Sequence, residues 1–289
     1  MLWIYDLPPW LFGLLVVGGG TAAALGGLAL VHRWRRLARE RRMARQPASA
    51  PESSQRAERR GLVGVETVGW FFGGVLTLYG ITLGLVTVAT WSNYTAVTDI
   101  ASAEAGALTA LYRDADGYPE PFRGELRGQL RGYTVDVIQV AWPLQRRGRL
   151  SDTGDARATA LQSTLVHFEP ATAGQQAVHA EALRAFATLV ERRRRRVESV
   201  PSAIPGVLWA VVLDGAGIVV LLAYTFPIRD FGRHAWLTGL VTATMGLLIF
   251  VIAELDHPYR GVVSVGPDAF QLVLDRVMVP ERGGGAPRR

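Results

Sequence analysis

Residues Val68–Trp91 read VGWFFGGVLTLYGITLGLVTVATW, and this stretch decides the fold. It carries no charged side chain, and an α-helix needs about 20 such residues to cross a hydrocarbon layer about 30 Å thick. In lipid, only a helix satisfies all of its backbone hydrogen bonds within one segment. Three more apolar runs follow the same pattern: Leu11–Val31, Ile204–Phe226 and Ala235–Ala253. The sequence therefore predicts an all-α, multi-pass membrane protein with four transmembrane helices.

The rest of the chain divides around these runs. The polar, Pro-rich stretch Gln46–Ser54 is typical of a flexible linker. Spans three and four are joined by a short turn, so we expect them to pack as an antiparallel pair. The predicted segments are an N-terminal tail with span one (1–31), a basic loop or linker (32–67), span two (68–92), a helical extramembrane domain (93–203), span three (204–226), span four (235–254) and a C-terminal tail (255–289).

The domain between spans two and three has helical periodicity. Apolar residues from Phe122 to Val140 recur at spacings of three and four, which places them along one face of a helix. A second stripe runs from Leu183 to Val197, and the Gly- and Pro-rich stretch Asp114–Pro121 ends the helix that continues from span two. These features predict a small helical bundle.

Charge predicts the topology. Arginines follow span one directly, and cytoplasmic loops of membrane proteins are enriched in Lys and Arg. This rule places the first loop and the loop between spans three and four in the cytoplasm, with the N-terminus and residues 93–203 outside the cell membrane. The run Arg192–Arg196, close to span three, argues for the opposite orientation. Anionic lipid headgroups account for the net charge of +6 better than nucleic acid does.

Small residues form a face on span two. Gly73, Thr77, Gly80, Gly84 and Thr87 alternate at spacings of four and three. Such rows let helix backbones approach closely, and Thr hydroxyls can bond across helices. Helix packing is the first interpretation of this face, and a pore lining is the alternative.

Asp214 is the ionisable residue near the middle of span three. A carboxylate at that depth costs about 2.5 to 3.5 kcal/mol on insertion scales, so it tends to face a cavity or a partner. Two interpretations stay open: a position on an ion or proton pathway, or a protonated group that hydrogen-bonds a neighbouring Thr or carbonyl.

Glu104 lies on the apolar side of its predicted helix. Five consecutive arginines circle a helix, so at least one of Arg192–Arg196 must turn inward. We expect a structural ion pair of Glu104 with Arg193 or Arg196. Catalysis is the weaker interpretation, because a lone carboxylate lacks the second group that acid–base chemistry needs.

The exit from span four reads Asp256-His257-Pro258-Tyr259-Arg260-Gly261. Pro258 ends the helix, and Gly261 permits a turn. A second histidine at ligand spacing is missing, and cysteines are absent, so we predict no metal site and no cofactor. The sequence also lacks a phosphate loop and a nucleophile elbow, so an enzyme is not expected.

Two groups of residues carry a family resemblance. They are Glu104-Ala105, Leu111-Tyr112-Arg113, Tyr118-Pro119, Tyr133 and Trp142-Pro143, and then Asp256, Pro258, Tyr259 and Gly261 with Arg196-Val197 and Trp209 upstream. This pattern resembles the bestrophin-like domain family of bacterial membrane proteins over most of residues 65–278. Two positions depart from the family pattern. Ala141 stands where a Glu often precedes the Trp, which removes a candidate charged group, and Tyr259 replaces a Phe.

The resemblance implies a function only by analogy. Bestrophins are oligomeric chloride channels with four spans per subunit, and they keep the large helical segment in the cytosol. A homo-oligomeric anion channel is therefore the first functional hypothesis, with membrane lipid, an inorganic anion and further copies of the chain as partners. The second hypothesis is a non-conducting membrane scaffold whose 93–203 bundle binds a protein partner.

Overall fold

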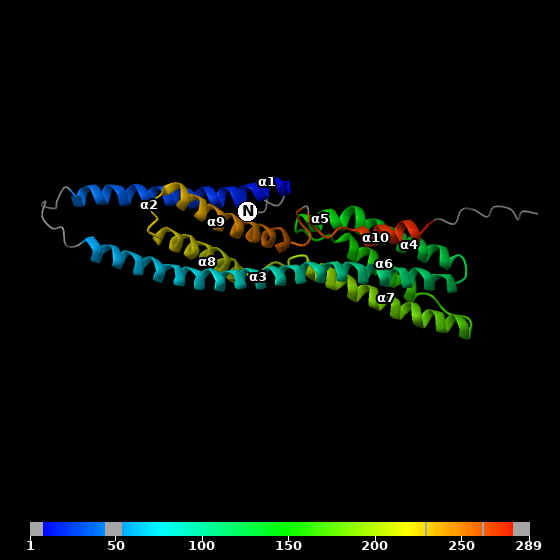
Figure 1. The fold of residues 1–289 in the computed structure, drawn as a ribbon. Coiled ribbons are helices and arrows are strands. Elements are labelled where there is room, and N and C mark those ends of the chain that lie inside the picture. The colour runs from blue at the N-terminus through cyan, green and yellow to red at the C-terminus, as the bar shows by residue number, and fades with distance from the viewer. Residues whose placement is uncertain (1–7, 44–53, 229, 262, 280–289) are drawn as a thin grey trace, which may run out of the picture. The chain divides into compact units, whose positions relative to one another are not determined.

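The computed structural model describes residues 8–43, 54–228, 230–261 and 263–279, and over these ranges the chain forms helices and no strand. The predicted all-α fold class is confirmed. The predicted linker Gln46–Ser54 lies outside the described residues except for Ser54, the residue at which helix α3 begins. The α-helices are α1 (Pro9–Gly13), α2 (Gly19–Met43), α3 (Ser54–Asp114), α4 (Phe122–Asp136), α5 (Trp142–Arg146), α6 (Thr153–Val166), α7 (Ala173–Ser199), α8 (Gly206–Thr225), α9 (Phe231–Asp256) and α10 (Asp268–Arg276) (Figure 1).

Short segments of other helical geometry join these elements. A π-helical turn, η2 (Leu14–Gly18), connects α1 to α2, and another, η4 (Val137–Ala141), connects α4 to α5. The helical face predicted from Phe122 to Val140 therefore continues from α4 into the π-helical turn η4. A 3₁₀ turn, η3 (Ala115–Gly117), ends the long helix α3 where the sequence predicted a break.

Within the described residues, four helical segments are long and apolar enough to cross a membrane. They are Pro9–Arg41, Thr67–Gly117, Gly206–Thr225 and Phe231–Asp256. The first includes α1, η2 and most of α2, so the basic stretch after span one continues the helix up to Met43. Prolines set the limits of the third span. Pro205 lies directly before α8, and Pro227 lies just beyond its end.

The chain forms two compact units. The membrane unit comprises residues 1–91 and 204–256, and the polar unit comprises residues 92–203 and 257–289, of which the ranges above are described. Helix α3 contributes to both units, since its residues up to Trp91 belong to the first and those from Ser92 onward to the second.

Small residues let the spans of the membrane unit approach one another. Span one packs along α9, and a Cβ at Gly246 of α9 would lie only 3.1 Å from the Cα of Val17 in η2 (Figure 1). At Gly27 of α2, a Cβ would meet the hydroxyl of Tyr224, which donates a hydrogen bond to the carbonyl of Ala24. Larger residues at these two glycines would force the helices apart, as in other close-packed membrane helices.

The polar unit has a conventional hydrophobic core. Helices α4, α6 and α7 surround the end of α3, with Leu108, Leu126 and Leu165 fully buried. Helix α10 packs into the same core through Phe270, whose ring lies 5.8 Å from that of Trp142. The segment after span four thus contributes a core helix to this unit.

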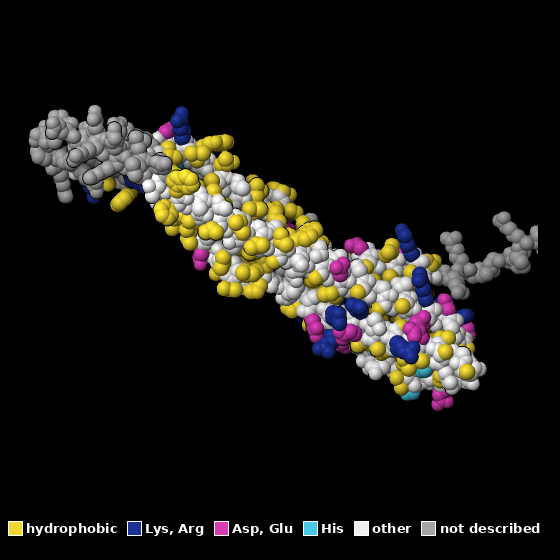
Figure 2. Space-filling view, turned by 60° about the horizontal axis from the view of Figure 1, so that its bottom comes forward, with side chains coloured by type: hydrophobic (Ala, Val, Ile, Leu, Met, Phe, Trp, Pro, Cys, Tyr) yellow, Lys and Arg dark blue, Asp and Glu magenta, His cyan; other side chains and the backbone are white. Residues whose placement is uncertain are grey.

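The surfaces of the two units differ in kind. Figure 2 shows hydrophobic side chains over the visible face of the membrane unit, and arginine, aspartate and glutamate side chains over that of the polar unit. Large apolar side chains that are more than half exposed include Leu78 and Leu85 of α3 and Leu221 of α8. Such a surface is suited to hydrocarbon and not to water.

Candidate functional site: uncovered span faces and a buried ion pair

The Gly/Thr face of α3 is uncovered in the membrane unit. Gly73, Thr77, Gly80 and Gly84 are exposed, and Thr87 is half-buried. A Cβ added at any of the three glycines would meet nothing within 4 Å. Thr77 donates its hydroxyl hydrogen to the carbonyl of Gly73 at 2.8 Å, within its own helix. The face is therefore smooth, slightly polar and free to receive another surface.

Asp214 lies on an exposed stripe of α8. Its neighbours on that face are exposed apolar residues at alternating spacings of four and three: Val207, Val211, Ile218 and Leu221. Asp214 forms no ion pair or hydrogen bond with the described residues. The stripe has the seam pattern through which helices pack, with a carboxylate in its middle. We refer to these five residues as the Asp214 stripe.

Helices α3 and α8 run antiparallel, and the part of α3 around Tyr79 lies at the same depth in the membrane unit as the middle of α8. Tyr79 of α3 donates its hydroxyl hydrogen to the carbonyl of Val212 at 2.7 Å. A Cβ at Gly215 would lie 2.4 Å from the ring of Tyr79, and Phe72 of α3 stacks edge-on against Phe226 at 5.2 Å. These contacts place Gly80 and Asp214 at the same level of the span.

A histidine pair joins α2 to α9. His32 Nε2 lies 3.0 Å from His234 Nδ1, and His234 Nε2 lies 2.9 Å from the carbonyl of Ala223. A carbonyl only accepts, so His234 Nε2 carries a hydrogen. When His234 is neutral its Nδ1 accepts, and His32 then donates. Arg35 completes this polar cluster by donating to the carbonyl of Tyr224 at 2.8 Å.

The pair was not anticipated from the sequence. His32 and His234 are 202 residues apart, and neither lies in a recognisable motif. The one available signal is that each stands next to an arginine at the polar end of a span: Arg33 beside His32, and Arg233 beside His234.

Glu104 and Arg196 meet in the centre of the polar unit. Arg196 Nε lies 2.6 Å from Glu104 Oε2, and its Nη2 lies 3.2 Å from Oε1. Glu104 is completely buried and Arg196 is 1% exposed. Tyr133 donates its hydroxyl hydrogen to Glu104 Oε1 at 2.6 Å. The carboxylate therefore accepts three hydrogen bonds, which is what a buried charge requires.

Aromatic rings enclose the Arg196 guanidinium. Its Cζ lies 5.5 Å from the ring centre of Trp142 and 5.8 Å from that of Phe270, distances typical of cation–π contacts. Burial alone would lower the pKa of Arg196, but the charge and hydrogen bonds of Glu104 outweigh it and raise the pKa above its ordinary value. Burial raises the pKa of Tyr133 well above its ordinary value, and the charge of Glu104 adds to the shift. The guanidinium stays charged and the phenol stays neutral.

Arg193, the other arginine expected to reach Glu104, has a different partner. Its Nη1 lies 2.6 Å from Asp155 Oδ1 of α6. Arg194 and Arg195 pair with Glu198 and Glu191 one turn away along α7. The structure thus selects one inward arginine from the run.

The residues that leave span four are held by two separate sets of contacts. In the membrane unit, Asp256 accepts hydrogen bonds from the backbone N–H of Ile204 at 2.6 Å and from Trp209 Nε1 at 3.1 Å. These bonds tie the end of α9 to the start of span three. The sequence placed Asp256 and Trp209 in one motif but gave no indication that they bond to each other, nor that Ile204 is a partner.

In the polar unit, the remaining motif residues shape a turn. The carbonyl of Pro258 accepts from the N–H of Val265 at 2.8 Å. The hydroxyl of Tyr259 lies 2.8 Å from that of Ser199 on α7, and burial raises the pKa of Tyr259. Gly261 has φ of 80°, a left-handed conformation that favours glycine. The hydroxyl of Tyr259 has a partner that Phe could not engage.

Comparison with known proteins identifies the family. The model of the bestrophin-like domain matches residues 43–270, which is most of the chain. The chain belongs to the bestrophin-like domain family. No curated protein and no solved structure matches it. Family membership and the four apolar helices together establish a membrane protein of the bestrophin-like type.

Proposed function

We propose that this bestrophin-like protein is one subunit of a homo-oligomeric anion channel in the cell membrane. The exposure of Asp214 in the middle of α8 carries the proposal. A carboxylate that faced lipid there would cost about 2.5 to 3.5 kcal/mol, whereas a protein partner or a water-filled path removes that cost. A single copy supplies neither to Asp214, so the membrane unit calls for a second one.

The Gly/Thr face of α3 is suited to receive the Asp214 stripe of another copy. The residues of both surfaces recur at spacings of four, three, four and three. The Gly/Thr face has small residues at these positions, and the Asp214 stripe has mostly bulky ones. Copies related by an axis along the membrane normal keep each residue at its own depth. Gly80 of one copy then lies opposite Asp214 of the next. The hydroxyl of Thr77, one turn away, can reorient to donate to that carboxylate.

The two faces lie on opposite sides of the α3–α8 pair. On α3, Gly80 and Gly84 each follow a buried contact residue, Tyr79 and Leu83, by one position. On α8, Val211 and Ile218 precede the buried residues Val212 and Val219 by one position. One residue turns a helix by about 100°. One step forward on α3 and one step back on the antiparallel α8 turn in the same sense about the membrane normal. The contact residues of the two helices point toward each other, so the same turn carries the two faces to opposite sides of the pair. Such a head-to-tail contact closes into a ring when the rotation between neighbouring copies is a whole fraction of a turn, and we propose that closed form.

A ring also favours anions at its approaches. Arg33, Arg36 and Arg39 are exposed near the end of α2. Copies of this group around one axis would attract anions and raise their local concentration. The family resemblance to oligomeric chloride channels supports the same ion class.

Halide flux tests the function. Purified protein in liposomes is expected to release or admit halide, followed by a halide-quenched dye, at a rate well above that of protein-free liposomes. Assembled protein that carries no flux would contradict the channel and would favour the scaffold, whose 93–203 bundle binds a protein partner.

Cysteine cross-linking tests the assembly. The chain has no cysteine, so introduced pairs are the only thiols. The variant with Gly84→Cys and Val211→Cys is expected to form covalent dimers and higher ladders on mild oxidation, because the proposed register brings these positions together between copies. The matched control carries Leu78→Cys and Leu213→Cys, two exposed positions off the two faces. Equal cross-linking of both variants would contradict the proposed contact.

We propose the orientation that the arginine count indicates, with the N-terminus and residues 93–203 outside. A reporter fused after Ala171 decides between the two orientations. Alkaline phosphatase activity there is expected, and a fluorescent cytoplasmic fusion would reverse the assignment.

A further inference from the structure

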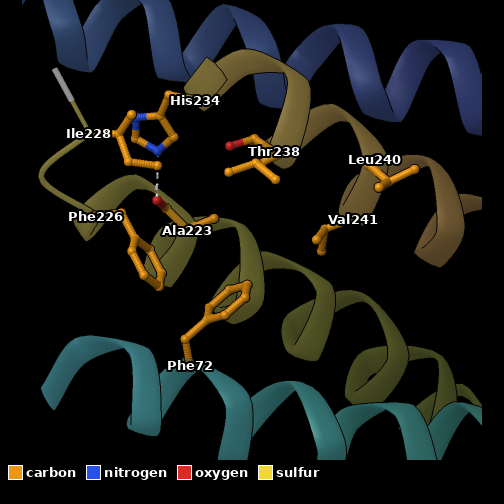
Figure 3. Close-up of a pocket in the computed structure, with 9 residues that line it drawn as sticks. Phe72, Ala223, Phe226, Ile228, His234, Thr238, Leu240 and Val241 are labelled. Carbon is orange, nitrogen blue, oxygen red and sulfur yellow. Dashed lines mark hydrogen bonds between the residues drawn. The ribbon is translucent and has the colours of Figure 1, made fainter. Parts of the chain in front are cut away.

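A pocket opens on the surface of the membrane unit beside the histidine pair. It has a volume of about 190 Å³ and lies between α3, α8 and α9 (Figure 3). Its wall is nearly all hydrocarbon. The lining residues are Phe72, Ala223, Phe226, Ile228, Leu237, Leu240 and Val241, with His234 and Thr238 at one side. Leu237 and Leu240 are each more than half exposed, so the pocket is open to the surrounding medium.

The medium at this position is a membrane. His234 is the fourth residue of α9 and Val241 the eleventh, so at 1.5 Å per residue the pocket extends about 10 Å along the helix. Both nitrogens of His234 are already hydrogen-bonded, to Ala223 and His32. Apolar cavities of this size stay free of water and take apolar molecules. A hydrocarbon chain is the occupant that meets these conditions.

Arginines of α2 lie near the polar end of the pocket. His32 touches His234, and the basic stretch of α2 starts directly after His32. Arg35 is bound to the carbonyls at the end of α8, one of which belongs to the lining residue Phe226. Arg36 and Arg39, on the same end of α2, are exposed and form no ion pair with the described residues. Cationic side chains at headgroup level attract anionic phospholipids.

We propose that this pocket binds one acyl chain of an anionic phospholipid, whose phosphate lies on the arginines at the end of α2. The chain enters between Leu237 and Leu240 and reaches inward as far as Val241. The headgroup stays at the level of His32. The site is a property of a single membrane unit, so it does not depend on the proposed channel or its assembly.

Native mass spectrometry of the full-length protein in detergent tests the site. The probes are dioleoyl phosphatidylglycerol and dioleoyl phosphatidylcholine, which share acyl chains and differ in headgroup charge. We expect one phosphatidylglycerol per chain, bound about 10-fold more tightly than phosphatidylcholine. Both lipids offer a phosphate to the two arginines, but the choline cation of phosphatidylcholine offsets its charge and is repelled by them. Equal affinity for the two lipids would overturn the headgroup part of the proposal.

Two variants separate the acyl chain from the headgroup. Val241→Phe fills the pocket and is expected to remove the tightly bound lipid of either type, whereas Val88→Phe makes the same change at an exposed position of α3 and should leave it in place. Arg36→Gln with Arg39→Gln changes only exposed side chains, so the fold is kept. It should abolish the preference for phosphatidylglycerol while phosphatidylcholine still binds.

The outcomes decide the proposal. Retention of one tight lipid per chain in a folded Val241→Phe variant would overturn the pocket as the acyl site. An unchanged phosphatidylglycerol preference in the double arginine variant would overturn the headgroup site, even if Val241→Phe failed to fold. Displacement of lipid only on self-association would identify a second copy of the chain as the occupant instead.

Discussion

The two units place their charged groups in opposite ways. The polar unit keeps Glu104 and Arg196 in its core, where they form an ion pair, and carries further charges on its surface. The membrane unit has an apolar surface, yet leaves Asp214 on that surface without a partner. The polar unit thus encloses its charge pair. The membrane unit carries a mid-span carboxylate for which the described residues provide no partner. Five experiments sharpen or break this contrast.

The largest effect is expected at the buried ion pair. Glu104→Ala leaves the Arg196 guanidinium buried without its carboxylate, which costs about 3 to 5 kcal/mol. The polar unit should unfold at lower denaturant or temperature, followed by the change in tryptophan fluorescence, to which Trp142 beside Arg196 contributes. The exposed carboxylate Glu198, paired with Arg194, provides the control: Glu198→Gln should not move the transition.

A double variant checks the cause of that loss. Replacing both partners, Glu104→Leu with Arg196→Met, removes the unpaired charge and should recover a large part of the lost stability. If the double variant is as unstable as Glu104→Ala, the unpaired charge of Arg196 is not the cause of the loss of stability.

The next effect concerns the incomplete membrane unit. Gly80→Leu fills the Gly/Thr face, and a Cβ at Gly80 meets none of the described residues within 4 Å, so the monomer should fold normally. Self-association should weaken by about 1 to 2 kcal/mol, roughly 10-fold, because the backbones can no longer approach. Sedimentation in detergent measures the shift. Gly74→Leu makes the same change at an exposed glycine off the face, and equal weakening by both would break the contrast.

Alkaline pH should act on the closed core of the polar unit. Burial raises the pKa of Tyr118 to about 12 and that of Tyr133 well above its ordinary value of 10. A raised pKa in the folded state means that the stabilising contribution is complete below pH 10. It is lost as the pH rises from about 10 through the folded-state values, by about 1 to 2 kcal/mol near pH 12. Thermal melts at pH 8 and pH 11.5 should show the decrease, and Tyr118→Phe should reduce it.

The smallest effect is expected at a helix end. The hydroxyl of Thr172 accepts from the N–H of Gln175 at 3.2 Å, and the Gln175 side chain accepts from the N–H of Ala171. These two bonds begin α7 in the polar unit, whereas Pro205 before α8 provides no side-chain cap. Thr172→Ala should destabilise the polar unit by about 1 kcal/mol. Denaturant titration would register this change, and Thr159→Ala, inside α6, is the matched control.

Local pattern explains how much of the fold was foreseeable. Length and hydropathy are properties of consecutive residues, so the run Val68–Trp91 predicts a span without knowledge of its neighbours. The same holds for the apolar stripe from Phe122 and for the break after Asp114. Helix α6 escaped prediction because few of its residues are buried and its apolar pattern is weak.

The amino-acid sequence alone determined that lipid is the solvent for four helices, that a helical bundle separates spans two and three, and that Glu104 needs a cation. Only the tertiary structure decided that Arg196 and not Arg193 supplies it, that His32 meets His234, and that Asp214 and the Gly/Thr face are uncovered. The reason is physical. Hydrophobic period depends on residues within a few turns, whereas a pairing or an exposed face depends on how helices rotate against each other, and no local pattern records that rotation.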